Sequence, residues 1–189
     1  MSLSRRSLLT LAMALPGASA LAELPAPWPR ALVMGTGQPG GYYTVYGQEW
    51  GRLAQQSAGL QIAFRASGGA AANILLIEQN AAQLGMTTLT VAEAARSGTG
   101  VWTAGVKFRE FRALFPMYPS VLQIVSPRST GITTLAGLAG QIVGIGPDGG
   151  SGAAAAPAIF SSLGVLPRQI VHGDYNQQMR DMLDGKLSA

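Results

Sequence analysis

The sequence contains no cysteine and a single histidine, His172. The absence of cysteine excludes disulfide bonds, a thiolate zinc site and a cysteine nucleophile. One imidazole leaves few ligands for a transition metal. We therefore expect neither a metal centre nor a cofactor, and we interpret His172 as a structural residue.

Charged residues are also scarce. They make up 12% of the chain, with 13 Lys and Arg against 9 Asp and Glu, whereas ordinary soluble domains contain about 25%. The basic residues do not cluster with aromatic side chains, so a nucleic acid partner is not expected. Neither a pair of carboxylates nor a Gly-x-Ser-x-Gly turn indicates a reaction centre. The sequence therefore predicts a protein that is not an enzyme.

The first 22 residues have the pattern of a secretory signal peptide. Arg5 and Arg6 precede a short apolar run, and Ala20 and Ala22 close two small-residue cleavage sites. The stretch around the two arginines also resembles a twin-arginine export signal, so both export routes stay open. We expect residues 1–22 to be removed and the mature chain to work in the periplasm.

From residue 30 onward, short apolar runs alternate with helical patterns. This alternation, together with 48% hydrophobic residues, predicts an α/β fold with mainly parallel sheets and helices on both faces. The predicted strands are residues 31–34, 61–64, 83–86, 112–115, 121–125, 142–145 and 169–171. The predicted helices begin near Tyr43, run through residues 73–77 and 91–95, and cover residues 153–163 and 177–183.

Two prolines, Pro116 and Pro119, separate two of the apolar runs. They predict a hinge or crossover between a first lobe at residues 30–118 and a second lobe at residues 119–189. After the last predicted helix, Leu187 looks like the beginning of another strand. We therefore expect the second lobe to be incomplete and the sequence to be a fragment.

Three glycine-rich loops, at residues 35–41, 67–69 and 146–152, each join a strand to a helix. Such junctions direct backbone N–H groups and the positive end of a helix toward the carboxyl edge of the sheet. Ligands bind at that edge in open α/β sheets. The loops therefore predict a site for an anionic group such as a carboxylate. The alternative, that they only form turns and helix caps, stays open.

The first loop also matches a dinucleotide-binding pattern through Gly35, Gly37 and Gly40. That pattern expects an acidic residue after the next strand, where this chain has Arg65. Pro39 removes one N–H donor from the loop. An exported nucleotide-dependent oxidoreductase therefore stays an alternative, but a weakly supported one.

Hydroxyl and amide side chains accompany the loops. Tyr42, Tyr43 and Tyr118 can stack on a ligand and donate a hydrogen bond. Asn73, Thr87 and Thr88 offer donors and acceptors near the beginnings of helices. Tyr43 also begins an apolar helical stripe, so burial in the core is an open alternative for it.

Five motifs follow one another in a familiar order and together resemble the TAXI family of solute-binding proteins, which serve TRAP transporters. The resemblance covers residues from about 32 to 189. The motifs are Gly35-Thr-Gly-Gln-Pro-Gly-Gly-Tyr-Tyr43, Ser67-Gly-Gly-Ala-Ala-Ala-Asn73, Leu114-Phe-Pro-Met-Tyr-Pro119, Gly131-Ile-Thr-Thr-Leu-Ala-Gly-Leu-Ala-Gly140 and Gly146-Pro-Asp-Gly-Gly-Ser-Gly152.

The resemblance implies a monomer with a two-lobed type II periplasmic binding fold. Its cleft would close on a small organic anion, glutamate or another carboxylate, and deliver it to a TRAP-type permease driven by an ion gradient. A binding protein that docks on a sensory receptor instead stays an alternative. The ligand contacts implied by the resemblance are Tyr42, Tyr43, Ser67, Gly68, Asn73, Thr87, Thr88, Tyr118, Gly149, Gly150 and Ser151.

The sequence departs from the family pattern at three places. Thr88 stands where a Gln is common, and Ser120 stands where a Glu is common. The stretch 153–156 is all alanine where a hydroxyl residue is common. Each lost buried hydrogen bond is worth about 0.5–1.5 kcal/mol. We therefore expect a ligand less polar than glutamate, or weaker binding.

Overall fold

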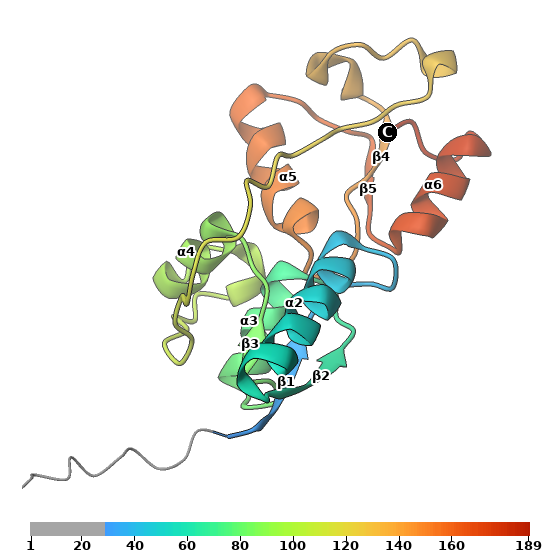
Figure 1. Cartoon of the computed structure of the whole chain (residues 1–189). Coiled ribbons are helices and arrows are strands. Elements are labelled where there is room, and N and C mark those ends of the chain that lie inside the picture. The colour runs from blue at the N-terminus through green and yellow to red at the C-terminus, as the bar shows by residue number, and fades with distance from the viewer. Residues whose placement is uncertain (1–28) are drawn as a thin grey trace, which may run out of the picture.

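The structure, a computed structural model, describes residues 29–189. These residues form two lobes, each built on a small parallel sheet (Figure 1). The predicted signal peptide, residues 1–22, lies outside the described residues. Among the described helices, none has both the length and the apolar character needed to cross a membrane.

The first lobe contains a three-stranded parallel sheet in the order β2-β1-β3. Three helices pack around this sheet, and each begins just after a strand ends, as the alternating pattern predicts. The strands are β1 (Ala31–Gly35), β2 (Gln61–Arg65) and β3 (Leu84–Gly85). The helices are α2 (Tyr42–Ala58), α3 (Ala70–Glu78) and α4 (Leu89–Ser97).

Helix α2 lies very close to the sheet because two glycines face it. A Cβ atom at Gly47 would lie 3.0 Å from the Thr36 side chain, and one at Gly51 would lie 2.5 Å from the Phe64 ring. Helical spacing predicts an apolar stripe on α2 formed by Tyr43, Tyr46, Gly47, Trp50, Leu53 and Ala54. This prediction is only partly correct, because Leu53 is 52% exposed. The pattern did not include Gly51, whose close contact with Phe64 depends on the absence of a side chain.

The second lobe contains two parallel strands, two helices and a core of its own. The strands are β4 (Ile142–Gly144) and β5 (Gln169–Val171), and the helices are α5 (Ser151–Leu163) and α6 (Tyr175–Leu183). The buried core consists of Leu138, Val143, Ile145, Ala156, Phe160, Val165 and Ala189.

The residues after α6 return to β4. The Ser188 N–H donates to the Ile142 carbonyl, and the Gly144 N–H donates to the Ala189 carbonyl, both at 2.8 Å. Leu187 is buried beside them. The predicted beginning of a further strand at Leu187 therefore corresponds to backbone contact with β4, although no regular strand forms there.

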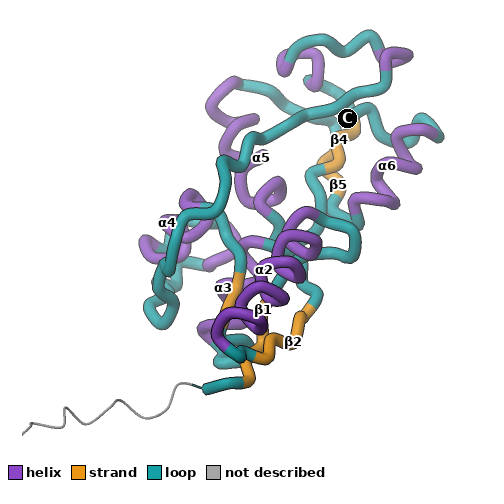
Figure 2. Tube along the Cα trace, viewed as in Figure 1, coloured by secondary structure: helices purple, strands orange, loops and turns teal. Residues whose placement is uncertain are grey.

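The strap, residues 112–125, connects the two lobes and runs along the outside of both (Figure 2). The predicted strands at residues 112–115 and 121–125 are wrong. Within the part of the chain that the structure describes, no backbone hydrogen bond reaches the strap. A strand needs a hydrogen-bonded neighbour, and Pro116 and Pro119 have no N–H to donate. The predicted lobe boundary between residues 118 and 119 falls within the strap and stays a prediction.

Candidate binding cleft between the lobes

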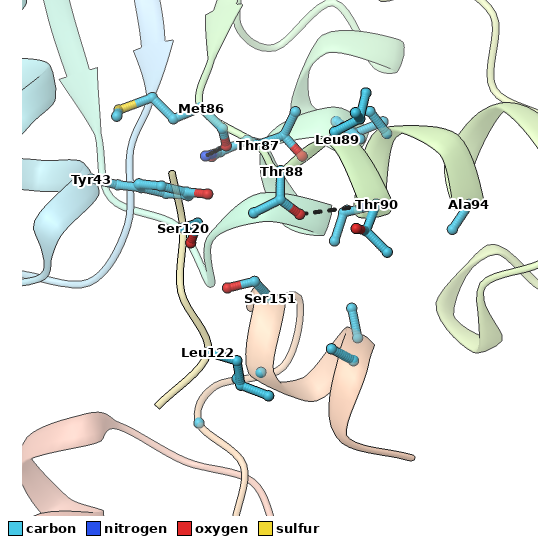
Figure 3. A pocket seen from close by; sticks show the side chains of 18 of the residues that line it. Tyr43, Met86, Thr87, Thr88, Leu89, Thr90, Ala94, Ser120, Leu122 and Ser151 are labelled. Carbon is cyan, nitrogen blue, oxygen red and sulfur yellow. Dashed lines mark hydrogen bonds between the residues drawn. The ribbon is translucent and has the colours of Figure 1, made fainter. Parts of the chain in front are cut away.

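A cleft of about 1370 Å³ lies between the two lobes and the strap. The first lobe contributes Tyr43 and residues 83–92, and the second lobe contributes residues 143–146 and the beginning of α5. In Figure 3, Tyr43 and the strap residue Ser120 lie on one side of the open space, and Ser151 lies across from them at the start of α5. Ligand pockets commonly have volumes of about 300–1000 Å³, so the cleft is large enough for a small molecule.

Three buried polar atoms in the described residues have no hydrogen-bond partner. They are Thr87 Oγ1, Tyr118 OH and Trp102 Nε1, and all three residues line the cleft. An unsatisfied buried polar group costs about 1–3 kcal/mol, so such groups are rare in folded proteins. A bound molecule with a hydrogen-bond acceptor would relieve that cost.

The tyrosines of the cleft remain protonated donors at neutral pH. Burial raises the pKa of Tyr118, and the neighbouring phenols of Tyr43, Tyr42 and Tyr46 raise it further. Burial also raises the pKa of Tyr43, with a smaller contribution from Tyr175. A neutral phenol donates a hydrogen bond to an anion without bringing a charge of its own.

Thr88 begins helix α4 and caps it. Its Oγ1 accepts a hydrogen bond from the Val91 N–H at 3.3 Å, and the dashed line in Figure 3 marks this contact. The Thr88 hydroxyl proton is not used by this bond. Thr88 therefore both fixes the start of α4 and presents a donor to the cleft that it lines.

Helix α5 begins in the cleft without a side-chain cap. Its N-cap is Gly150, which has no side chain to offer. Within residues 29–189, the N–H groups of Ser151, Gly152 and Ala153 have no hydrogen-bond acceptor. The first N–H groups of a helix attract negative charge. Ser151, one of the predicted contacts, lines the cleft at this helix end.

Asn73 and Ser67, two other predicted contacts, bond within the first lobe. The Asn73 side chain is 1% exposed, and its Nδ2 donates to the carbonyls of Thr36 and Met86, both at 2.7 Å. The Ser67 Oγ lies 3.1 Å from Thr36 O and 2.7 Å from Asn73 Oδ1, and its one proton can be donated to either acceptor. These bonds join the ends of β1 and β3 to α3. Asn73 touches the cleft as part of its wall, whereas Ser67 does not line it.

The loops at residues 67–69 and 146–152 contact each other instead of meeting over a ligand. The Gly149 carbonyl accepts hydrogen bonds from the N–H groups of Ala71 and Ala72, at 2.8 and 3.3 Å. It therefore caps α3, and the other lobe satisfies two of the N-terminal donors of this helix. Gly68 and Gly150 lie in this contact, and neither they nor Gly149 line the cleft.

Tyr42 also lies outside the cleft lining. Its ring is 65% exposed and packs edge-on against Tyr118, with 4.6 Å between the ring centroids. Tyr46 contacts Tyr118 in a similar way at 5.2 Å. Tyr42 therefore positions Tyr118, and of the two adjacent tyrosines only Tyr43 reaches the cleft.

Ionic groups contribute little to the cleft. Glu110 and Arg112 are the charged members of its lining. The Arg112 guanidinium donates through Nη1 to the carbonyls of Arg109 and Phe111. The Glu78 carboxylate nearby accepts from the N–H groups of Glu110 and Phe111. In the described part of the chain, no cluster of three or more His, Asp or Glu could hold a metal ion.

His172 lies at the surface. Its Nδ1 is 2.8 Å from Oδ1 of Asp148, and neither residue lines the cleft. The imidazole therefore orients the carboxylate of the third glycine loop. A residue that sequence reasoning missed is Trp102, which lines the cleft and whose buried indole N–H has no hydrogen-bond partner among the described residues. Its only signal in the sequence was an aromatic residue among the glycines Gly98, Gly100 and Gly105.

Comparison with known proteins decides the family. A model of the NMT1-like family matches residues 34–189, which is most of the chain. The protein belongs to the NMT1-like family.

A solved structure shows which fold the NMT1-like chain adopts. It is the alkanesulfonate-binding protein SsuA from Xanthomonas axonopodis pv. citri bound to MOPS, with a TM-score of 0.58 and 16% sequence identity. The match covers 86% of this chain and 54% of that chain, so the NMT1-like chain spans about half the length of that structure. The predicted α/β fold with parallel sheets, of the type II periplasmic binding protein kind, is thereby confirmed.

Proposed function

We propose that this NMT1-like protein binds a small organic anion in the cleft between its lobes and delivers it to a TRAP-type membrane permease. The observation that carries the proposal is the pair of unpartnered hydroxyls, Thr87 Oγ1 and Tyr118 OH, in a cleft between two lobes. A ligand that accepts two hydrogen bonds would satisfy both groups.

The charge of the ligand follows from the donors. Thr87, Tyr118 and the uncapped start of α5 supply hydrogen-bond donors, and the Tyr43 phenol adds another. Neutral hydrogen-bond donors together with the positive end of a helix favour an anion over a cation. The described cleft lining holds no pair of residues suited to acid and base catalysis, so reversible binding fits it better than turnover.

Export and transport are the remaining parts of the proposal. The signal peptide pattern at residues 1–22 supports export to the periplasm, with cleavage near Ala20 or Ala22. The ordered motifs that resemble the TAXI family support delivery to a TRAP permease. Cell fractionation of the expressed chain tests export, and N-terminal sequencing of the product locates the cleavage site.

Thermal unfolding of the expressed chain with and without ligands tests the binding function. The panel contains amino acids, monocarboxylates, dicarboxylates and sulfonates, together with neutral amides of the same size. A ligand at 100 times its Kd stabilises the folded state by about 2.7 kcal/mol. We expect at least one anion to raise the Tm and its neutral amide to leave it unchanged. If no anion in the panel raises the Tm, the proposal is rejected.

A matched pair of variants locates the binding. Thr87→Val removes the unpartnered hydroxyl with little change in shape, and Thr133→Val makes the same change at an exposed position outside the cleft. We expect about tenfold weaker binding in the first variant and unchanged binding in the second. Equal affinities in the two variants would place the ligand elsewhere.

A further inference from the structure

The described lining of the cleft carries no net charge. Its charged residues are one acid, Glu110, and one base, Arg112, whose Nη1 already donates to two backbone carbonyls. A second carboxylate inside the cleft would lose its hydration and bring a further negative charge that this lining does not balance. An unpaired buried charge is strongly unfavourable.

The described cleft lining contains few unpartnered hydroxyls. Thr87 Oγ1 and Tyr118 OH belong to the first lobe and the strap, and Ser151 lines the cleft from the second lobe. Two oxygens of a single carboxylate can accept hydrogen bonds from several donors of this kind. The remaining lining must therefore receive whatever is attached to that carboxylate.

Most of that remaining lining is apolar. The first lobe and the strap contribute large side chains, and the second lobe contributes others across the cleft. They include Trp50, Ile77, Leu84, Phe115, Ile159 and Met179. A hydrocarbon body gains affinity when it leaves water for such a surface, whereas a polar body loses its hydration without replacement.

We propose that the cleft selects a monocarboxylate with an apolar chain, such as hexanoate, and rejects dicarboxylates of the same length. The inference rests on the proposed function, because it specifies the anion bound at that site. Thr87 and Tyr118 bind the carboxylate, and the apolar side chains of both lobes bind the hydrocarbon.

Four ligands of the full chain test the selection: acetate, hexanoate, adipate and hexanamide, each measured by calorimetry. Burial of one methylene group strengthens binding about fourfold, so hexanoate is expected to bind about two hundredfold more tightly than acetate. Adipate adds a second carboxylate to the same chain length, and hexanamide removes the charge. Each is expected to bind at least tenfold more weakly than hexanoate.

The outcomes separate this inference from the proposed function. If adipate binds as tightly as hexanoate, or if glutamate binds and hexanoate does not, the selection is wrong and anion binding stands. If hexanamide binds as tightly as hexanoate, the selection for a carboxylate is wrong. The proposal that the cleft binds an anion then also loses its support. If no anion binds, both proposals fail.

A second matched pair tests the assigned carboxylate contact. Tyr118→Phe removes the unpartnered hydroxyl, and Tyr46→Phe makes the same change in the aromatic cluster but outside the cleft. We expect Tyr118→Phe to weaken hexanoate binding about tenfold and to abolish the preference over hexanamide. Tyr46→Phe should change neither. A Tyr118→Phe variant that still folds and still binds hexanoate more tightly than hexanamide would contradict the contact between the Tyr118 hydroxyl and the carboxylate.

Discussion

The Gly149 carbonyl in the second lobe accepts a 2.8 Å hydrogen bond from the Ala71 N–H in the first lobe. Helix α3 is thus capped by the backbone of the opposite lobe. Because the Gly149 carbonyl accepts from the N–H groups of both Ala71 and Ala72, it occupies that helix end. The donors that line the cleft include the Tyr43 phenol on α2, the Thr87 hydroxyl before α4, the Tyr118 phenol of the strap and the start of α5.

The contact between the glycine loops depends on Gly68. A Cβ atom there would overlap the Asp148 carbonyl oxygen of the other lobe. Gly68→Ala is expected to separate the lobes at this edge and to lower the free energy of unfolding by about 1–3 kcal/mol, a range typical of overpacking. Urea unfolding measures the loss of stability, and X-ray scattering in solution measures the increase in the radius of gyration.

Gly37→Ala is the matched control for this experiment. Gly37 lies in another glycine loop, but its Cβ would make only an ordinary contact, 3.4 Å from the Tyr43 side chain. We expect a change in unfolding free energy within about 0.5 kcal/mol. Equal effects of the two variants would show that the lobes are not in contact at Gly68.

Asn73 is expected to be essential for stability. Replacement by Ala leaves the buried Met86 carbonyl without its side-chain donor and the Thr36 carbonyl with only the Ser67 hydroxyl. Since each unsatisfied buried group costs about 1–3 kcal/mol, Asn73→Ala should lower the free energy of unfolding by about 2–4 kcal/mol. Urea denaturation measures this loss in the free energy of unfolding, and Asn176→Ala, at an exposed position, is the control. A loss below about 1 kcal/mol would argue against these hydrogen bonds.

Alkaline pH is expected to destabilise the protein through its buried phenols. Burial raises the pKa of Tyr43, Tyr118 and Tyr175 above the ordinary value of 10.0. The folded state therefore holds protons that the unfolded state releases. The stabilisation that these protonated phenols give the folded state is fully present below pH 10 and is lost as the pH rises above 10. Urea midpoints measured between pH 8 and 11 show the decline.

Tyr118→Phe provides the comparison for the alkaline series. The variant should lose less stability than the parent between pH 9 and 11, because it lacks one of the perturbed phenols. Absorbance of tyrosinate at high pH should also show one late-titrating group fewer. Parallel pH profiles for the two proteins would contradict the burial of Tyr118.

The strap is expected to be held against α2 by aromatic contacts. Phe115 stacks on Trp50 with 5.9 Å between the ring centroids and an interplanar angle of 28°. Such a pair contributes about 0.5–1.5 kcal/mol. Phe115→Ala should therefore speed tryptic cleavage after Arg112 in the strap about fivefold, whereas Leu114→Ala, at a 69% exposed position, should have little effect. Limited proteolysis followed by mass spectrometry measures both variants.

The regular elements of both lobes were predictable because each depends on local patterns. All five described strands and all five described α-helices coincide with predicted apolar runs and helical spacings. The strap was mispredicted for a physical reason. Its apolar residues and extended backbone resemble a strand locally, but a strand forms only where another backbone hydrogen bonds to it.

The residues predicted to contact the ligand fall into two groups. Tyr43, Asn73, Thr87, Thr88, Tyr118 and Ser151 line the cleft, whereas Tyr42, Ser67, Gly68, Gly149 and Gly150 do not. The sequence identifies a glycine loop before a helix, but the N–H groups of that loop can face a ligand or a backbone carbonyl equally well. Which of these occurs depends on the other lobe.

The sequence by itself determined the α/β alternation, the glycine loops and the shortage of charge, because these follow from residue order and composition. The tertiary structure alone decided the rest. It placed the Gly149 carbonyl on the end of α3, shielded Thr87 Oγ1 and Tyr118 OH from water without a partner, and enclosed the Trp102 indole N–H. Each of these joins residues far apart in the chain, and hydrogen bonding and burial at such distances are set only when the lobes pack together.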